Sequence, residues 1–191
     1  AGMRPDAVPE GTDVIFTTPS HHCPTSVTLP MVRREALLAR ARQLDALIVE
    51  DDYEFETAYL KPAMPALKSL DPDGRVIYVG SFSKSLFPGL RLGYLVVPRH
   101  LAGPMNRLRS ELFREGRMLD QAVLAQFIFD GDLDAWCRRI QRDYLGRQQV
   151  LHDQLRSLPQ VRSVSAPSSA ISLCVEFAPG VNDVAIAQAL L

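Results

Sequence analysis

The chain has 191 residues, of which 47% are hydrophobic and 23% charged, and its formal net charge is −1. These values are typical of an ordinary globular protein and exclude a disordered chain. The near-neutral charge gives no general reason to expect nucleic acid or an acidic membrane as a partner, and no apolar run has the length of a membrane span. Cys23, Cys137 and Cys174 are odd in number and scattered, which fits reduced thiols and predicts a cytoplasmic protein.

The first half of the chain combines predicted strands with one predicted helix. A β-rich run at residues 12–18 ends before Pro19 and leads into a polar loop. Residues 29–44 carry apolar side chains at helical spacing among arginines, which predicts an amphipathic helix. Compact apolar runs predict further strands at residues 46–49, 75–80 and 92–97. Strand, helix and further strands together predict an α/β sheet.

The second half is mainly helical in pattern. Helices are predicted at residues 99–115, 118–130 and 133–157. The last of these is long and has a repeating apolar face, as expected of a helix that bridges two domains. Residues 170–177 alternate like a half-buried strand, and Asn182 can cap a helix over residues 184–191.

The change in pattern predicts two domains. Residues 1–130 are expected to form part of a large α/β domain. Residues 131–191 are expected to hold the bridging helix and part of a smaller domain.

Lys84 lies in the most informative stretch, residues 81–93, between two serines and seven residues before Arg91. A Schiff base with an aldehyde needs an amine that can lose its proton, which arginine cannot do near neutral pH. Lys61 and Lys68 are the only other lysines, and they lie in a predicted loop and beside a turn signal. Lys84 alone has neighbours suited to binding a phosphate group.

Polar clusters follow three of the predicted strands, at residues 20–26, 51–53 and 81–84. Ligands of α/β sheets bind at the carboxyl ends of the strands. We therefore expect one crevice to collect all three clusters.

These clusters meet the chemical demands of pyridoxal phosphate. Its aldehyde needs a lysine, for which Lys84 is the candidate. Its ring nitrogen needs an acid, which we assign to Asp51, and its phenolate oxygen needs a donor, which we assign to Tyr53. Its phosphate needs hydroxyl groups and a fixed cation, which are offered by Ser81, Ser83 and Arg91.

Each of these residues also has a plainer structural explanation. Asp51 and Asp52 can form a solvated turn, Tyr53 can be a core aromatic, Arg91 can join a surface ion pair, and Ser81 can be a turn residue. The combination favours a cofactor site, because a soluble domain seldom places all of these residues after two neighbouring strands.

A metal site is not predicted. His21, His22 and Cys23 are adjacent, so their side chains point apart on an extended segment, and the sequence has no second cluster of ligands. We therefore predict no metal-binding residues.

The chain resembles a known family in residues 18–25, 50–53, 80–84 and 87–94. These stretches are similar to the aminotransferase-like domain of MocR-type regulators of the GntR family, which are fold-type-I pyridoxal-phosphate proteins fused to a winged helix-turn-helix. The resemblance covers almost the whole chain. It implies the three-layer α/β sandwich of fold-type-I transferases, here as a partial large domain and the start of an α+β small domain.

Carried over residue by residue, the resemblance implies that Lys84 binds the aldehyde, Asp51 the ring nitrogen, Tyr53 the phenolate oxygen and Arg91 the phosphate. One motif departs from the pattern. Fold-type-I aminotransferases often have Asn-Pro-Thr-Gly, in which the asparagine contacts the phenolate oxygen. Here cysteine and serine replace the asparagine and the glycine, at Cys23 and Ser26, and His22 is a weak substitute for that contact.

The resemblance implies the effector-sensing module of a cytoplasmic, homodimeric MocR-type transcriptional regulator. Such a module takes an amino acid or amine and reaches DNA only through a winged-helix domain, which is expected ahead of Ala1; no membrane partner is expected. The alternative is a catalytic class I/II aminotransferase that transfers an amino group between an amino acid and a 2-keto acid, with Lys84 as acid and base. A third hypothesis is a degenerate domain that serves only in dimerisation.

Overall fold

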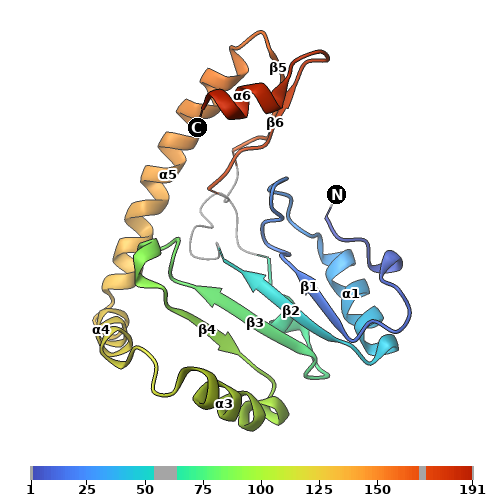
Figure 1. The fold of residues 1–191 in the computed structure, drawn as a ribbon, viewed down its shortest axis with the longest axis vertical. Coiled ribbons are helices and arrows are strands. Elements are labelled where there is room, and N and C mark those ends of the chain that lie inside the picture. Colours follow the sequence, from blue (N-terminus) through green and yellow to red (C-terminus); the bar gives the residue numbers. More distant parts are fainter. Residues whose placement is uncertain (1, 54–63, 168–170, 191) are drawn as a thin grey trace.

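The computed structural model describes residues 2–53, 64–167 and 171–190, and the structural statements below concern these residues. Four strands form the main sheet in the order β1-β2-β3-β4 (Figure 1). Their bounds are Val14–Thr17, Leu47–Asp52, Val76–Ser81 and Gly93–Val96. β1, β2 and β3 are parallel, and β4 pairs with β3 in the antiparallel direction. The predicted α/β sheet is therefore confirmed.

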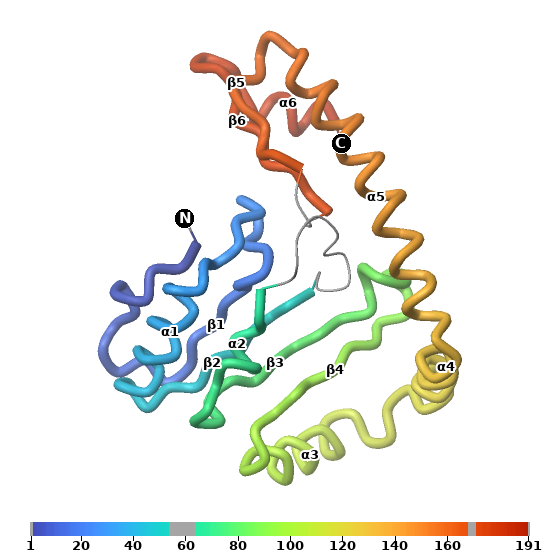
Figure 2. The backbone as a smooth tube through the Cα atoms, turned by 180° about the vertical axis from the view of Figure 1, so that it is seen from behind, coloured from blue at the N-terminus to red at the C-terminus, as the bar shows by residue number. Residues whose placement is uncertain are grey.

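One face of this sheet is covered by α1 (Met31–Leu44) and the short α2 (Leu67–Leu70). α1 lies behind β1 in Figure 1 and in front of it in the reverse view of Figure 2. Strand residues alternate between the two faces, so every second side chain enters the layer below α1. The resulting core contains Ile15, Leu29, Leu37, Ala41, Ala46, Ile48, Leu67 and Val76.

The helical half begins after β4 with α3 (Arg99–Phe113) and α4 (Met118–Phe129). α5 (Asp132–Arg156) then runs from α4 to a small antiparallel pair, β5 and β6 (Figure 1). β5 spans Val161–Val164 and β6 spans Val175–Phe177. All three helices lie where the sequence predicts them.

Short elements complete the structure. The last helix, α6 (Asp183–Ala189), begins at Asn182, whose side chain accepts a hydrogen bond from the Ala185 amide at 3.0 Å, as expected of an N-cap. Two 3-10 helices are present, η1 (Pro5–Ala7) and η3 (Pro88–Leu90). The Ser26 hydroxyl lies 3.3 Å from the Ser172 carbonyl oxygen and links the sheet to the segment before β6.

The structure corrects three strand predictions. β2 continues to Asp52 instead of ending at residue 49, because its pairing with β3 extends to Asp52 and Gly80. β5 is not among the predicted strands; its short sequence becomes a strand by pairing with β6. β6 begins at Val175, later than the predicted start, and residues 168–170 lie outside the described part of the chain.

The other face of the sheet carries exposed apolar side chains. Phe16 is 73% exposed, and Val14 and Leu95 are also exposed. The accessible surface totals 12392 Å², whereas a compact monomer of this mass exposes about 9,000 Å². The exposed apolar side chains of this face and of the helical half contribute to the larger surface. In the described residues, no helix combines the length and hydrophobicity needed to cross a bilayer.

Candidate functional site

The strand register brings the predicted site residues to one edge of the sheet. Asp51 pairs with Val79, two residues before Ser81, so Asp51 and Ser81 lie on the same face of neighbouring strands. Ser81 also pairs with Gly93, which places Arg91 at the same edge, just before antiparallel β4. The carboxyl ends of β2 and β3 thus bring these polar residues to the same edge of the sheet.

Lys84 lies in a tight turn that directly follows β3. The Leu86 amide donates to the Phe82 carbonyl at 2.9 Å and closes the turn. The Lys84 side chain is exposed and has no hydrogen bond or ion pair with any described residue. Lys68, in contrast, donates through Nζ to the Val76 carbonyl at 2.8 Å. Lys61 lies outside the described residues. Of the two described lysines, Lys84 is therefore the one with an available amine.

The hydroxyl and cationic candidates for the phosphate lie around this turn. Ser81 Oγ accepts from the Ser83 amide at 3.2 Å, which leaves its own proton for another acceptor. Arg91 is exposed and adopts a left-handed conformation, with φ of 50°. Neither the Ser83 hydroxyl nor the Arg91 guanidinium is bonded within the described residues, so both remain accessible to an anion.

The two neighbouring aspartates of β2 point to opposite faces. Asp51 is exposed on the open face, and partial removal from water raises its pKa. Asp52 is buried on the α1 side, where its Oδ2 accepts from the Tyr78 hydroxyl at 3.2 Å and burial raises the pKa of both residues. Only Asp51 can meet a ligand on the open face. Both aspartates lie in β2 and not in a solvated turn. The role of Asp51 at the ring nitrogen stays a prediction.

Tyr53 is oriented by the loop that follows β1. Its hydroxyl donates to the His21 carbonyl at 3.1 Å. Since a phenol has one proton, Tyr53 must release His21 before it can donate to a phenolate oxygen. In the same loop, Ser26 has a φ of 54°, a conformation that favours glycine, which is the residue often present at this motif position.

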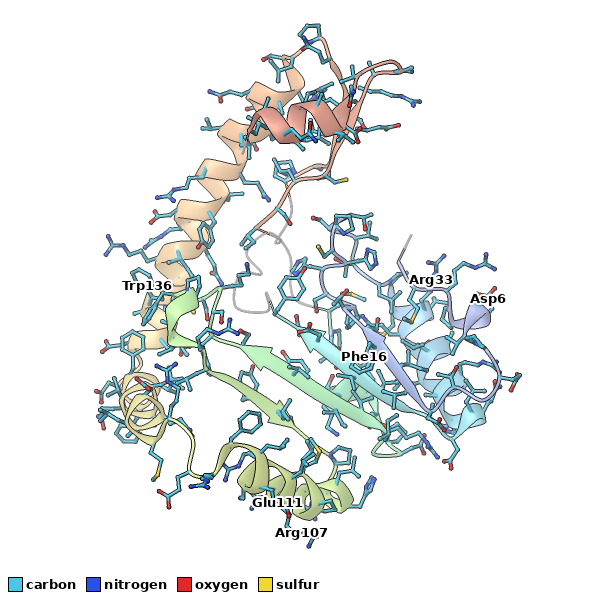
Figure 3. The ribbon with its side chains drawn as sticks, viewed as in Figure 1. Asp6, Phe16, Arg33, Arg107, Glu111 and Trp136 are labelled. Atoms are coloured by element: carbon cyan, nitrogen blue, oxygen red, sulfur yellow. The ribbon has the colours of Figure 1, made fainter. Side chains whose placement is uncertain are left out.

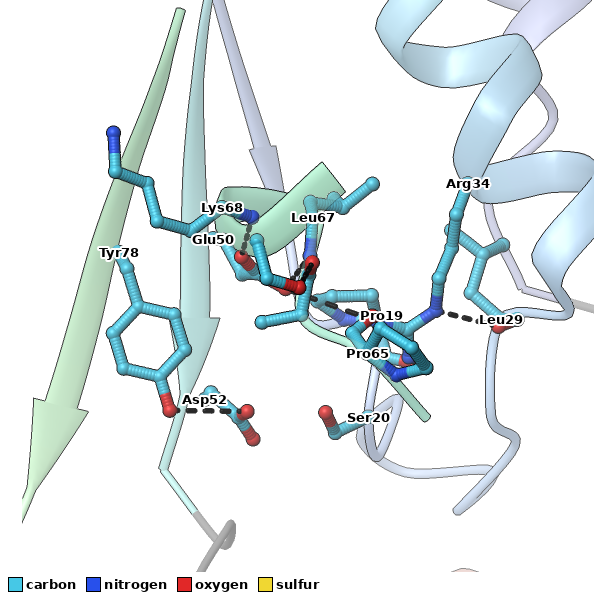
Figure 4. Close-up of polar contacts among 12 residues, drawn as sticks. Pro19, Ser20, Leu29, Arg34, Glu50, Asp52, Pro65, Leu67, Lys68 and Tyr78 are labelled. Atoms are coloured by element: carbon cyan, nitrogen blue, oxygen red, sulfur yellow. Dashed lines mark hydrogen bonds and ion pairs between the residues drawn. The ribbon is translucent and has the colours of Figure 1, made fainter. Parts of the chain in front are cut away.

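A buried ion pair supports the site from below (Figure 4). Arg34 and Glu50 are both fully buried, and Arg34 Nη1 lies 3.8 Å from Glu50 Oε1. The Arg34 guanidinium also donates at 2.9 Å to the carbonyls of Leu29, Pro65 and Pro19. Burial lowers the pKa of Arg34 and raises that of Glu50, and an arginine nevertheless stays protonated.

The Glu50 carboxylate completes this arrangement. It accepts from the amides of Leu67 and Lys68 at 2.7 and 2.8 Å, at the start of α2. The pair therefore holds three segments together: the loop after β1, the start of α2 and the end of β2. Asp51 and Tyr53 follow Glu50 directly in the chain.

The sequence reasoning missed the pair, although a signal was present. Arg34 lies three and seven residues before Leu37 and Ala41, both of which are buried on the inner face of α1. Glu50 is two residues after Ile48 and shares its buried face in β2. Each of these charged residues occupies a position that faces the core in its helix or strand. A pair of opposite charges at such positions indicates an internal ion pair.

The residues described here form no metal cluster around Lys84. No group of three His, Cys, Asp or Glu side chains suited to a metal occurs among them. A cavity of about 960 Å³ lies beside the lysine turn, between Phe82, Leu92 and the facing ends of α3 and α4. Lys84, Asp51 and Tyr53 do not line it.

Comparison with known proteins places this arrangement in a family. The profile of class I and II aminotransferases matches residues 6–191. The chain belongs to this aminotransferase family. Sequence relatives confirm its resemblance to MocR-type regulators. Solved structures confirm the fold-type-I assignment.

The sequence relatives of this aminotransferase-family chain include transcriptional regulators. It is 50% identical over 150 residues to the HTH-type transcriptional regulator TauR of Rhodobacter capsulatus. The aligned residues cover 78% of this chain and 31% of that protein. It is 43% identical over 137 residues to the probable rhizopine catabolism regulatory protein MocR of Rhizobium meliloti, with coverage of 72% and 28%. The chain thus spans about a third of the length of these relatives.

The structural relatives include aminotransferases. The crystal structure of the Pyrococcus horikoshii kynurenine aminotransferase superposes with a TM-score of 0.82 at 27% sequence identity. The match covers 92% of this chain and 44% of that one. That structure is described as a complex with PMP and with kynurenine as substrate.

The described residues fit a pyridoxal-phosphate cofactor in their chemistry. The open edge offers an unpaired amine at Lys84, a carboxylate at Asp51 and an unpaired guanidinium at Arg91. The Tyr53 hydroxyl is the one member whose proton is already donated elsewhere. These groups therefore suit the cofactor, provided that the Tyr53 hydroxyl releases the His21 carbonyl.

Proposed function

We propose that this chain is part of a pyridoxal-phosphate-binding, effector-sensing module of a MocR-type transcriptional regulator. The observation that carries the proposal is the 50% identity to a transcriptional regulator, compared with 27% to the solved aminotransferase. The exposed, unpaired Lys84 at the carboxyl edge of the sheet supports cofactor binding by the same chain.

Each site residue has one role in this proposal. Lys84 would hold the aldehyde group through its amine, and Asp51 would hold a proton at the ring nitrogen. Ser81, Ser83 and Arg91 bind the phosphate, with arginine preferred for its planar set of donors. Tyr53 donates to the phenolate oxygen once it releases the His21 carbonyl. Pyridoxal phosphate, when bound, supplies an electrophilic carbon and an electron-withdrawing ring.

We further propose that residues 1–130 belong to the large cofactor-binding domain and residues 131–191 to the bridging helix and small domain. The effector would be an amino acid or amine, which carries the amino group that can compete with Lys84 for the aldehyde. The whole protein would be a cytoplasmic homodimer that reaches DNA through a separate winged-helix domain.

Borohydride reduction of the full-length protein in the presence of pyridoxal phosphate tests this proposal. We expect the reduced cofactor on Lys84 when the protein is digested and its peptides are mapped. Lys68→Arg is the matched control, because Lys68 already donates to Val76; this variant should be labelled like the wild type. Lys84→Arg should not be labelled. Labelling of another lysine in the wild type would refute the assignment.

A second candidate is a catalytic aminotransferase, favoured by the structural match to the Pyrococcus horikoshii enzyme. In that case Lys84 would also move a proton at the substrate α-carbon. Incubation of the full-length protein with amino donors and 2-keto acids distinguishes the two functions. Repeated turnover supports the enzyme, whereas ligand-dependent DNA binding without turnover supports the regulator.

A further inference from the structure

The turn that carries Lys84 is anchored from outside the sheet. Ser85, the next residue, is only 1% exposed, and its carbonyl accepts a hydrogen bond from Trp136 Nε1 at 2.7 Å. Figure 3 places Trp136 at the end of α5 that lies beside this turn. The indole has a single N–H, and it donates to the residue that directly follows Lys84 in the turn.

A second anchor lies at the far end of the same loop. Arg117, the residue before α4, donates through Nη1 to the Leu90 carbonyl, one residue before Arg91. The lysine and the arginine proposed for the cofactor are thus each adjacent to a backbone carbonyl held by the helical half. Of the two anchors, the Trp136 bond lies closer to Lys84 and ends on a buried residue.

Trp136 also lies near the start of α5, the long helix that leads to β5 and β6. It lies in the second turn of a helix of 25 residues, whose other end leads to β5 and β6. A rotation of α5 moves the indole, and the Ser85 carbonyl must follow it or lose the bond. The helix and the lysine turn are therefore coupled through one hydrogen bond.

We propose that Trp136 is a positioning residue for Lys84, which holds the lysine turn through Ser85 and couples it to α5. This inference rests on the proposed function, because it assigns Lys84 to the cofactor. Loss of one such bond typically costs about 1 kcal/mol. Retention of pyridoxal phosphate by the full-length protein should therefore weaken by about threefold to tenfold in Trp136→Phe.

The test compares wild type, Trp136→Phe and Ile140→Val in the full-length protein. Ile140→Val shortens a buried side chain one turn along the same helix and removes no hydrogen bond. The dissociation constant for pyridoxal phosphate is measured from the absorbance of the lysine-bound cofactor. Hydrogen exchange of the Leu86 amide, which closes the turn, is measured without cofactor. We expect weaker retention and faster exchange in Trp136→Phe, and unchanged values in Ile140→Val.

The outcomes separate this inference from the proposed function. If wild type is not labelled at Lys84, the proposed function fails and the inference fails with it. If wild type is labelled and Trp136→Phe matches it in both measurements, only the inference fails. Should Trp136→Phe not fold, replacement of the indole by benzothienylalanine keeps the ring shape and removes the N–H. The same two measurements then decide the question.

Discussion

The sheet with α1 and the helical half from α3 onward differ in where their apolar side chains lie. The first region has a continuous buried core from Ile15 to Val76. In the described part of the second region, Leu124 and Ile140 are the buried apolar side chains, whereas several large ones are exposed, including Leu112, Phe113, Leu119 and Phe129. The first region thus has a core of its own, whereas the second is held to it by individual hydrogen bonds such as Trp136 to Ser85.

The difference shows how a site can be rigid on one side and adjustable on the other. Asp51 extends from a strand fixed by the Arg34–Glu50 pair, while Lys84 and Arg91 lie in a loop held from α4 and α5. Five predictions test the contrast, beginning with the largest expected effect.

Arg34→Met should have the largest effect on the stability of the first region. It leaves Glu50 buried without its countercharge and three carbonyls without their donor, which costs about 3–5 kcal/mol. Arg42→Met is the matched control on the same helix, because Arg42 pairs with Asp73 at the surface and should lose less than about 1 kcal/mol. Urea unfolding measures both. Equal losses would show that the buried pair has no special importance.

Leu37→Ala should destabilise the first region by about 2–5 kcal/mol, because it opens a cavity in the core. Leu119→Ala removes the same atoms from an exposed position of α4 and should change the unfolding free energy by about 0.5 kcal/mol or less. Thermal and urea unfolding of the two variants measure the contrast directly. A large loss in Leu119→Ala would show that this side chain is covered in the full-length protein.

The pH dependence should differ between the regions. Burial raises the pKa of Glu50 and Asp52, so the folded state holds their protons more tightly than the unfolded state. Their contribution to the free energy of unfolding is largest below their unfolded-state pKa of about 4. It is lost as the pH rises through their raised pKa in the folded state. The unfolding free energy should therefore fall with rising pH across this window, and Asp52→Asn should reduce the fall.

Asp153 in α5 provides the opposite case. A hydrogen bond from Gln149 lowers the pKa of Asp153, so its contribution is present above about pH 4 and is lost as pH falls through the lowered pKa. Asp153→Asn should weaken the loss of stability in acid. Urea unfolding over a pH series measures both variants, and the same pH response in Asp52→Asn and Asp153→Asn would contradict the assignment.

Ser85→Ala should have the smallest effect. The Ser85 hydroxyl is buried without a hydrogen-bond partner among the described residues, while its carbonyl accepts from Trp136. Removal of an unpaired buried hydroxyl is neutral or stabilises by up to about 1 kcal/mol. Thermal unfolding should show an equal or higher midpoint. A clear loss would reveal a partner for the hydroxyl in the full-length protein.

Much of the fold could be predicted because its local signals agree. Apolar residues at helical spacing located α1, short β-rich or apolar runs located the four strands of the sheet, and Asn182 marked the start of α6. β5 could not be found in this way, because a four-residue strand has little local signal and depends on its pairing with β6. The end of β2 was missed for the same reason.

For the site, the sequence by itself determined which residues have suitable chemistry. One candidate lysine near hydroxyl groups and an arginine, and an acid before a tyrosine, are properties of residue type and spacing. Only the tertiary structure decided how these groups are presented. Strand alternation turned Asp51 to the open face and Asp52 to the core, and the His21 carbonyl engaged the Tyr53 hydroxyl. The Arg34–Glu50 pair and the Trp136 bond join residues 16 and 51 positions apart, and such contacts arise from packing rather than from local sequence.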